Sequence, residues 1–268
     1  MLHSQISSLS LDIVFIVETW LSAKIPDIQI CPPGYKIIRK DRISKKGGGV
    51  LVLYKNKFPI VEIHNMKTDD VEYLSIDLVG NKKKNSIRFT CFYVPPDLSC
   101  DHNTIEKLCK CIKKHSTKYS NYIIGDFNMP SINWKCLSSS TSVGKQFLNF
   151  SIENSLVQRV HEPTTIYDSL LDLILCDNAS FKQVNSIEVL QPLTMKCDHS
   201  MVNFSLEYNH LETAYSNIPN SFSYERGNYT EINNRLSLIN WHHVFNYYQN
   251  DIQKIYDFFL ETVHSLVK

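Results

Sequence analysis

The chain has 268 residues, a hydrophobic content of 43%, a charged content of 21% and a formal net charge of +1. These values are those of an ordinary soluble globular protein, long enough for one large α/β domain or a domain with an appendage. A charge so close to zero does not identify a nucleic-acid partner, but a local basic patch can bind one without any global charge.

The sequence carries no sign of secretion or of a membrane span. It does not begin with a basic segment followed by small residues, and no apolar run reaches the ~18 residues of a transmembrane helix. The eight cysteines include no Cys-x-x-Cys pair, so we interpret them as reduced thiols rather than as a disulfide framework. We therefore expect an intracellular protein, nuclear or cytoplasmic, with no membrane partner, whose Asn-x-Ser/Thr triplets are chance matches.

The first half of the chain alternates strand patterns with turns. Residues 1–10 have helical spacing, and the apolar run 11–17 predicts a strand that is covered on both faces and followed directly by Glu18. Further strands are expected at 35–39, 50–54, 61–64, 71–78 and 86–93. A carboxylate just beyond a buried strand is notable because ligands collect at strand ends in layered α/β folds.

Two loops in this half have competing interpretations. Gly47-Gly48-Gly49 precedes a strand rather than a helix and lacks a Gly-Lys-Ser/Thr sequence, which favours tight packing or a bulge over a phosphate cradle. The run 82–84 places three lysines on a predicted hairpin tip. A solvated surface is the usual meaning of such a run, and phosphate contact is the sharper alternative.

The segment 122–128 predicts a buried strand that ends at a polar loop. Asp126 and Asn128 are two residues apart, so on an extended chain both side chains point the same way. Amphipathic helices are expected on either side, at 104–115 and 142–154.

The last strands of the domain also carry polar residues. Residues 170–176 predict a buried strand containing Asp172, whose charge is costly unless it is paired. Asp198 and His199 open a final strand at 201–206 and are natural partners for it. Beyond residue 207 the hydrophobic alternation stops, so we predict a domain at 1–207 and a linker with a C-terminal helix at 208–268.

These strand ends carry a set of side chains suited to metal-assisted phosphodiester hydrolysis. The set consists of Glu18, Asp126, Asn128, Asp172, Asp198 and His199. Carboxylates with an amide oxygen suit Mg²⁺ or Mn²⁺, whereas zinc prefers more nitrogen or sulfur. A histidine beside a carboxylate can orient a water or polarise a phosphoryl oxygen. Each residue alone is more often a surface or capping residue, and only their joint occurrence carries the inference.

The motif series of the chain resembles that of the endonuclease/exonuclease/phosphatase superfamily. The motifs, in order, are Glu18-Thr19-Trp20, Gly47-Gly48-Gly49-Val50, Tyr93-Val94-Pro95-Pro96, Gly125-Asp126-Phe127-Asn128, Glu162-Pro163-Thr164, Leu171-Asp172-Leu173-Ile174-Leu175 and Asp198-His199. More closely, residues 2–206 resemble the apurinic-like endonuclease domain of non-LTR retrotransposon polyproteins. The resemblance implies a four-layered α/β (α+β) sandwich, with two packed, mostly antiparallel sheets flanked by helices. The tail resembles the connector toward a reverse transcriptase, a partner domain in such polyproteins.

The resemblance also implies a role for each polar residue at the phosphate. Asp126 would activate or hold the attacking water, and Asn128 would position it. His199 would contact the phosphoryl oxygen or move a proton, with its ring oriented by Asp172. Tyr93 would lie against the scissile phosphate.

The remaining roles concern the metal and the outer shell. Glu18 would be the principal ligand of Mg²⁺ or Mn²⁺, assisted by Asp198. Thr164 would belong to the outer shell, as would Cys197, which stands where the family usually has Ser. The family's domain begins with a strand carrying an Asn at the site, whereas this chain begins within the following helix, so the resemblance implies that this first strand is missing.

The implied activity is a metal-dependent nick in DNA that leaves a 3′-hydroxyl to prime reverse transcription. A phosphatase or lipid phosphodiesterase of the same superfamily is the rival enzyme, and the prolines after Tyr93 and the retroelement-like tail argue against it. The rival from another class is an inactive remnant that keeps the fold or only binds nucleic acid.

Overall fold

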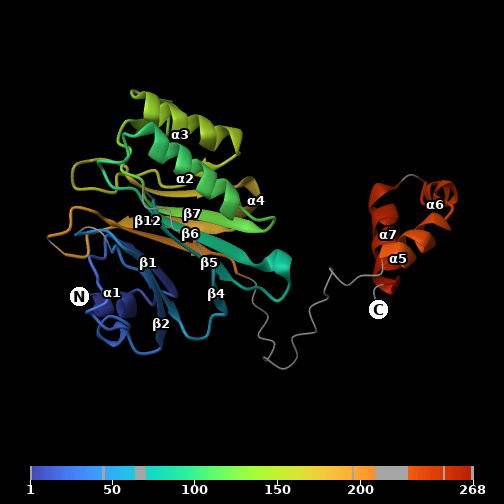
Figure 1. Cartoon of the computed structure of the whole chain (residues 1–268), viewed down its shortest axis with the longest axis horizontal. Helices are drawn as coiled ribbons and strands as arrows, with labels where there is room; N and C mark the ends of the chain where they lie inside the picture. Colours follow the sequence, from blue (N-terminus) through green and yellow to red (C-terminus); the bar gives the residue numbers. More distant parts are fainter. Residues whose placement is uncertain are drawn as a thin grey trace. The chain divides into compact units, whose positions relative to one another are not determined.

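The structure is a computed structural model that describes residues 2–43, 46–63, 71–194, 196–208, 229–249 and 251–266 (Figure 1). The chain divides into two compact units, Met1–Leu211 and Glu212–Lys268. The predicted site residues all belong to the first unit.

The first unit is organised around a six-stranded sheet in the order β10-β11-β7-β6-β5-β4. Its strands are β4 (Ile60–Ile63), β5 (Glu72–Leu78), β6 (Ile87–Tyr93), β7 (Ser120–Asp126), β10 (Val157–Gln158) and β11 (Asp172–Cys176). Neighbours run antiparallel except β6 and β7, which are parallel because α2 connects them. Because these two central strands are parallel, their C-terminal ends lie side by side at the same end of the sheet.

A second layer of strands faces this sheet. It contains a three-stranded sheet in the order β1-β3-β2 and the hairpin β12-β13, both antiparallel. The strands are β1 (Ile13–Val17), β2 (Tyr35–Lys40), β3 (Val50–Lys55), β12 (Val184–Leu190) and β13 (Met201–Leu206). Among the described residues, β1 pairs with β3 alone and β13 with β12 alone. A separate small hairpin joins β8 (Ile132–Asn133) to β9 (Ser138–Ser139).

Helices complete the layers on both outer faces. They are α1 (Leu2–Ser8), α2 (His102–His115), α3 (Ser142–Glu153) and α4 (Asn178–Phe181), with short 3₁₀ turns at η1 (Asp27–Gln29) and η2 (Lys83–Asn85). Figure 1 shows α2 and α3 together on one side of β6 and β7, and α1 beyond β1 and β2 on the other side. The mixed α/β sandwich with mostly antiparallel sheets confirms the predicted fold class.

Three apolar clusters bind the layers together. Phe92, Phe127 and Phe147 are fully buried between the six-stranded sheet and helices α2 and α3. A second cluster fills the space between the strand layers, where the ring of Phe15 in β1 lies 5.5 Å from that of Phe89 in β6. A third places Ile6 of α1 against the outer face of β3. Truncating a buried aromatic ring costs about 3–5 kcal/mol, so these clusters fix the scaffold beneath the site.

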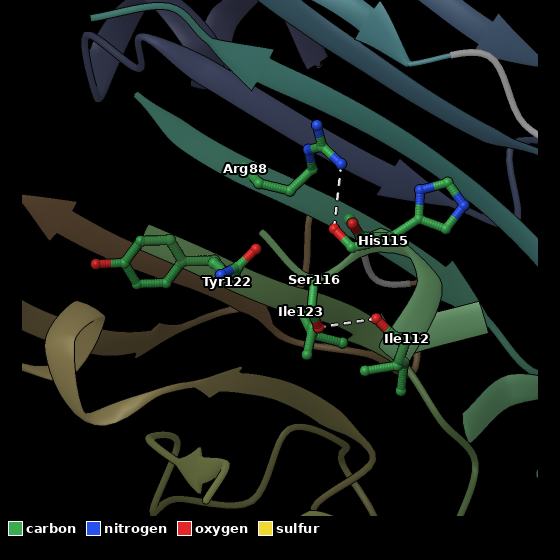
Figure 2. A pocket seen from close by; sticks show the side chains of 8 residues that line it. Arg88, Ile112, His115, Ser116, Tyr122 and Ile123 are labelled. Carbon is green, nitrogen blue, oxygen red and sulfur yellow. Dashed lines mark hydrogen bonds between the residues drawn. The ribbon is translucent and has the colours of Figure 1, made fainter. Parts of the chain in front are cut away.

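Polar contacts fix both ends of α2. Asp101 caps its N-terminus by accepting the N–H of Thr104 at 2.7 Å. At its C-terminus Arg88 of β6 donates to the carbonyl of His115 at 3.1 Å, beside the small pocket shown in Figure 2. Arg88 also pairs with Asp77 of β5, so the helix end is tied to two strands. This network fixes α2 against the sheet.

The elements differ from the sequence-based expectation in a few places. The sequence pattern does not predict β12, because the exposed residues Asn185, Ser186 and Glu188 interrupt its apolar positions. The run 82–84 lies at the end of β6 opposite Tyr93, which favours the solvated-surface interpretation of its lysines. The expected strand end at His64 lies outside the described residues.

The second unit is helical. Its helices are α5 (Tyr229–Ser237), α6 (Trp241–Tyr247) and α7 (Ile252–Leu266), of which the sequence pattern predicts only α7. The ring of Trp241 contacts those of Phe258 and Phe259, with centroids 6.3 and 6.2 Å away, which joins α6 to α7. Within the described ranges of both units, no helix combines the length and apolarity that a membrane crossing requires.

Candidate active site

Three neighbouring strands bring the acidic residues and a tyrosine to one edge of the six-stranded sheet. The antiparallel register of β11 and β7 places Asp172 opposite Asp126. The parallel register of β6 and β7 places Tyr93 beside Asp126. Backbone pairing alone therefore assembles these three residues, which are far apart in sequence.

Gly125 and Asn128 shape the backbone around Asp126. Gly125 has φ +126°, and a Cβ there would lie 1.9 Å from the carbonyl oxygen of Phe92, so only glycine allows this approach of the two strands. Asn128 has φ +50°, a left-handed conformation that asparagine tolerates better than most residues. The predicted glycine-acid-amide motif thus turns the chain sharply at the strand end.

Asp126 is a buried carboxylate held by Asn128. Only 2% of Asp126 is exposed. Its two oxygens accept the backbone N–H of Asn128 at 3.0 Å and the side-chain amide at 2.8 Å. Burial raises the pKa of Asp126 to about 7, and the charge of Asp172 acts in the same direction. A carboxyl group with this pKa is suited to exchanging a proton at neutral pH.

His199 lies between the two aspartates. Its Nδ1 is 2.8 Å from Oδ2 of Asp172, and its Nε2 is 4.0 Å from Oδ2 of Asp126. The hydrogen bond to Asp172 raises the pKa of His199 to about 9, against the lowering effect of burial. His199 is therefore protonated at neutral pH, and Asp172 has the partner that its position in a strand requires.

Thr164 and Cys197 bond to the backbone next to the Asp172 and His199 side chains. The hydroxyl of Thr164, which is fully buried, accepts the backbone N–H groups of Leu171 and Asp172 at 3.1 and 3.0 Å. The thiol of Cys197 lies 3.3 Å from the carbonyl oxygen of His199 and donates to it. Both predicted outer-shell residues thus contact the backbone of the residues they are expected to support.

Glu18 and Tyr93 form the opposite side of the site. Glu18 is exposed at the end of β1, with φ +50°. The hydroxyl of Tyr93 donates a hydrogen bond to Oε1 of Glu18. Burial, followed by this hydrogen bond, raises the pKa of Tyr93, so the phenol remains a proton donor.

The three consecutive glycines pack against the segment that follows Glu18. The N–H groups of Thr19 and Trp20 donate to the carbonyls of Gly49 and Gly48 at 3.3 and 2.9 Å. A Cβ on Gly49, which has φ +91°, would lie 2.5 Å from Oγ1 of Thr19. The structure therefore supports tight packing, rather than a phosphate cradle, as the reason for this motif.

The sequence pattern does not reveal an ion pair that lies beside Tyr93. Nε of Arg42 donates to Oε1 of Glu72, whose other oxygen accepts the N–H of Gly49 at 2.6 Å. The guanidinium of Arg42 lies over the ring of Tyr93, 5.8 Å from its centroid. The only signal in the sequence is that Arg42 lies in a charged loop, which does not indicate a partner thirty residues away.

The donor groups of the site suit a divalent cation. Asp126, Asp172 and His199 each offer one ligand atom, all within 4.8 Å of one another. Glu18 and Asp198, predicted as the metal ligands, are both exposed and lie outside that group. Asp198 adjoins His199, and its charge helps to raise the pKa of that histidine. A set dominated by carboxylates fits a hard cation such as Mg²⁺ or Mn²⁺, and the assignment of individual ligands stays a prediction.

Comparison with known proteins agrees with this architecture. Residues 87–203 match the model of a protein family described as endonuclease-reverse transcriptase. A search of curated protein sequences finds no match.

Solved structures share the fold at low sequence identity. The endonuclease domain of TRAS1, a telomere-specific non-LTR retrotransposon, superposes with a TM-score of 0.59 and 14% identity, covering 78% of this chain and 91% of that domain. An AP endonuclease from Archaeoglobus fulgidus superposes with a TM-score of 0.59 and 15% identity, covering 77% of this chain and 93% of that one. The 3′ phosphatase NExo from Neisseria, bound to a product DNA hairpin, also superposes with a TM-score of 0.59 and 15% identity. The match covers 77% of this chain and 93% of that one. At such identities the likeness concerns the fold.

Proposed function

We propose that the first unit is a divalent-metal-dependent phosphodiesterase of the endonuclease/exonuclease/phosphatase superfamily that nicks DNA, which the family match and the shared fold support. The observation that carries the proposal is the row formed by Asp172, His199 and Asp126 at one sheet edge. It combines a protonated imidazole with a buried carboxyl group whose pKa is about 7. Phosphodiester hydrolysis needs both a proton acceptor for water and a donor for the phosphoryl oxygen.

Asp126 is the proposed acceptor of the water proton. In its ionised form it attracts a water molecule, and Asn128 restricts the carboxylate to one orientation through two hydrogen bonds. The amide of Asn128 is itself held by the carbonyl of Val94 at 2.9 Å. The attacking oxygen is thereby directed from a fixed point, which lowers the entropic cost of the reaction.

His199 is the proposed donor to the phosphoryl oxygen. Asp172 keeps the imidazole protonated and fixes its rotation through Nδ1, which leaves the Nε2 proton for the substrate. The distance of 4.0 Å between Nε2 of His199 and Oδ2 of Asp126 is too long for a hydrogen bond, so the two groups do not pair with each other. Both can act on a reacting oxygen placed between the two residues.

Glu18 and Tyr93 are proposed to act on the opposite side of the phosphate. Glu18, with Asp198, would hold Mg²⁺ or Mn²⁺, which when bound neutralises phosphoryl charge as a Lewis acid. Tyr93 orients the Glu18 carboxylate by donating its hydroxyl proton to it, which places the neutral phenol beside the phosphate. Thr164 and Cys197 maintain the backbone of the Asp172–His199 pair.

The proposed substrate and product are supported by the family match rather than by the site geometry. The matched family is described as endonuclease-reverse transcriptase, and the TRAS1 domain with the same fold is a retrotransposon endonuclease. We propose a nick with a free 3′-hydroxyl that primes a reverse transcriptase domain of a parent polyprotein. Such a reaction would take place inside the cell, in the nucleus or the cytoplasm.

A plasmid relaxation assay tests the activity. The full chain is incubated with supercoiled plasmid in Mg²⁺ or in EDTA, and formation of the open circle is followed. We expect open circles with Mg²⁺ and none in EDTA. If a folded wild-type chain produces none with Mg²⁺, the protein is an inactive remnant and the proposal is wrong.

An oligonucleotide assay separates nuclease from phosphatase. A duplex with a 3′-phosphate at an internal nick is compared with an intact duplex. The proposal predicts cleavage of the intact duplex, whereas release of phosphate without strand cleavage would assign the chain to the phosphatase alternative.

A further inference from the structure

Trp20, two residues beyond Glu18, is a large aromatic side chain left open to solvent. Its exposure is 58%, although tryptophan is among the residues most strongly driven to bury their surface. Its backbone has φ +54°, a left-handed conformation that is uncommon for a bulky residue. Backbone in such a conformation persists only where its surroundings hold it, and it concentrates at functional sites.

The indole ring of Trp20 is held in a defined place. The N–H of Trp20 donates to the carbonyl of Gly48 at 2.9 Å. A Cβ built on Gly47 would lie 3.6 Å from the indole, so the glycine backbone is close to one part of the ring. The ammonium of Lys46 lies 5.7 Å from the ring centroid. The backbone bond to Gly48 holds the residue, the ring lies beside Gly47 and Lys46, and more than half of the residue stays exposed.

Arg42 adds a second cation to this side of the site. Its Nε is committed to Glu72, and its guanidinium lies over the ring of Tyr93. The Arg42 side chain is 18% exposed, and among the described residues its two terminal nitrogens make no hydrogen bond. A planar guanidinium with free N–H groups matches the geometry of a phosphate.

We infer that Trp20, Arg42 and Lys46 form a subsite for the nucleotide next to the scissile phosphate. The indole stacks on a base or deoxyribose, and the two cations contact the flanking phosphates. Aromatic rings combined with basic side chains are how proteins hold exposed nucleotides. The inference rests on the proposed function for its choice of DNA as the occupant.

Neither a core role nor an idle surface position accounts for Trp20. A core residue would be buried, whereas Trp20 is exposed two residues from Glu18 and beside the ammonium of Lys46. A protein partner could cover the ring, but it would not account for two cations adjoining a phosphodiesterase site. The ammonium of Lys46 next to the indole therefore favours a polyanion as the occupant.

The test measures DNA binding separately from cleavage. Binding of a fluorescein-labelled duplex of ~20 base pairs, enough to span such a site, to the full chain is measured by anisotropy in EDTA, where no hydrolysis occurs. Trp20→Ala should weaken binding about tenfold, the loss expected for one stacked base, while Trp20→Phe should keep most of the affinity. Val61→Ala is the matched control, because Val61 is 52% exposed on β4 at the far edge of the sheet and should leave binding unchanged.

Lys46→Ala provides a second readout that does not depend on the tryptophan. Lys46 is exposed, so its loss should not affect folding. It should reduce the slope of log affinity against log salt concentration by about one, the value for one lost phosphate contact. An unchanged slope, together with unchanged affinity in Trp20→Ala, would overturn the inference.

Binding and cleavage outcomes separate this inference from the proposed function. Trp20-dependent binding by a chain that does not nick plasmid would uphold the subsite and refute the nuclease. Nicking in which Trp20→Ala changes neither affinity nor KM would uphold the nuclease and refute the subsite. If the wild-type chain does not bind DNA and only a protein partner covers the Trp20 ring, the proposed nucleotide subsite is refuted.

Discussion

The two sides of the site are built in different ways. Asp126 and Asp172 stand on two paired strands, and their position opposite each other follows from sheet register. Glu18 and Trp20 stand in a loop segment with left-handed backbone, held by hydrogen bonds to a run of glycines. The strand side is buried and has shifted pKa values, whereas the loop side is exposed.

This difference suggests a division of labour. Burial changes protonation, so proton transfer belongs on the strand side, where the pKa of Asp126 is about 7. Exposure allows a long polymer to enter, so we place the proposed nucleotide contacts, and the proposed metal ligand Glu18, on the loop side. Substitutions that affect one side and spare the other can test this division.

The largest effect is expected from removing the charge of Asp126. Asp126→Asn should lower the nicking rate roughly 10³-fold, because the proton acceptor is lost. The melting temperature should stay the same or rise, since the carboxylate is buried beside the charge of Asp172. Nicking kinetics and thermal unfolding are measured on the same preparation. A clear fall in melting temperature would show that Asp126 stabilises the fold instead.

Glu18→Ala tests the loop side. We expect roughly a 10²-fold loss of nicking and a higher Mg²⁺ requirement, because a proposed ligand is removed. The free energy of unfolding should change by less than ~1 kcal/mol, since Glu18 is exposed. A large loss of stability in a denaturant titration would assign Glu18 a structural role.

Gly49→Ala tests whether the glycine run positions the loop side. The new Cβ would meet Oγ1 of Thr19 at 2.5 Å, so we expect a loss of about 2 kcal/mol, with weaker Mg²⁺ activation of nicking. Gly34→Ala is the matched control, because Gly34 also has positive φ, +83°, but has open space around its Cβ position. Its cost should be about 1 kcal/mol from backbone strain alone, with normal Mg²⁺ activation. Equal effects of the two substitutions would argue against the packing role.

The smallest expected effect is a shift in the pH profile. Nicking should rise as Asp126 ionises near pH 7 and fall as His199 loses its proton near pH 9. Asp172→Asn removes the main cause of the raised pKa of His199. The fall in nicking rate on the alkaline side of the pH profile should therefore move to lower pH by about one unit. If this fall in nicking rate stays at the same pH, it reflects the titration of a group other than His199.

The strand side is largely predictable from the sequence. Buried strands are recognisable as apolar runs, and the polar residues at their ends, Asp126 and Asp172, stand out against that background. The need of Asp172 for a partner points correctly to His199. What the sequence does not supply is the register that places Asp126 opposite Asp172, since pairing depends on the whole sheet.

The loop side is much less predictable. The three glycines are recognisable as a packing feature, but their contacts with Thr19 and Trp20 depend on left-handed backbone that non-glycine residues do not indicate in a sequence. The Arg42–Glu72 pair joins a loop to a strand thirty residues away, and charged residues in a loop are usually just solvated. Strand β12 escapes prediction for a related reason, because exposed polar residues interrupt its apolar positions.

The most direct measurement concerns the new end created in DNA. Plasmid treated with the wild-type chain and Mg²⁺ is incubated with a DNA polymerase and labelled nucleotides, without prior removal of phosphate. We predict label incorporation at the nick, because the proposed reaction breaks the bond between phosphorus and the 3′-oxygen, which takes a proton from solvent and becomes a free hydroxyl. We predict no incorporation with Asp126→Asn. Absence of nicks, or nicks that the polymerase extends only after treatment with a phosphatase, would contradict the proposed reaction.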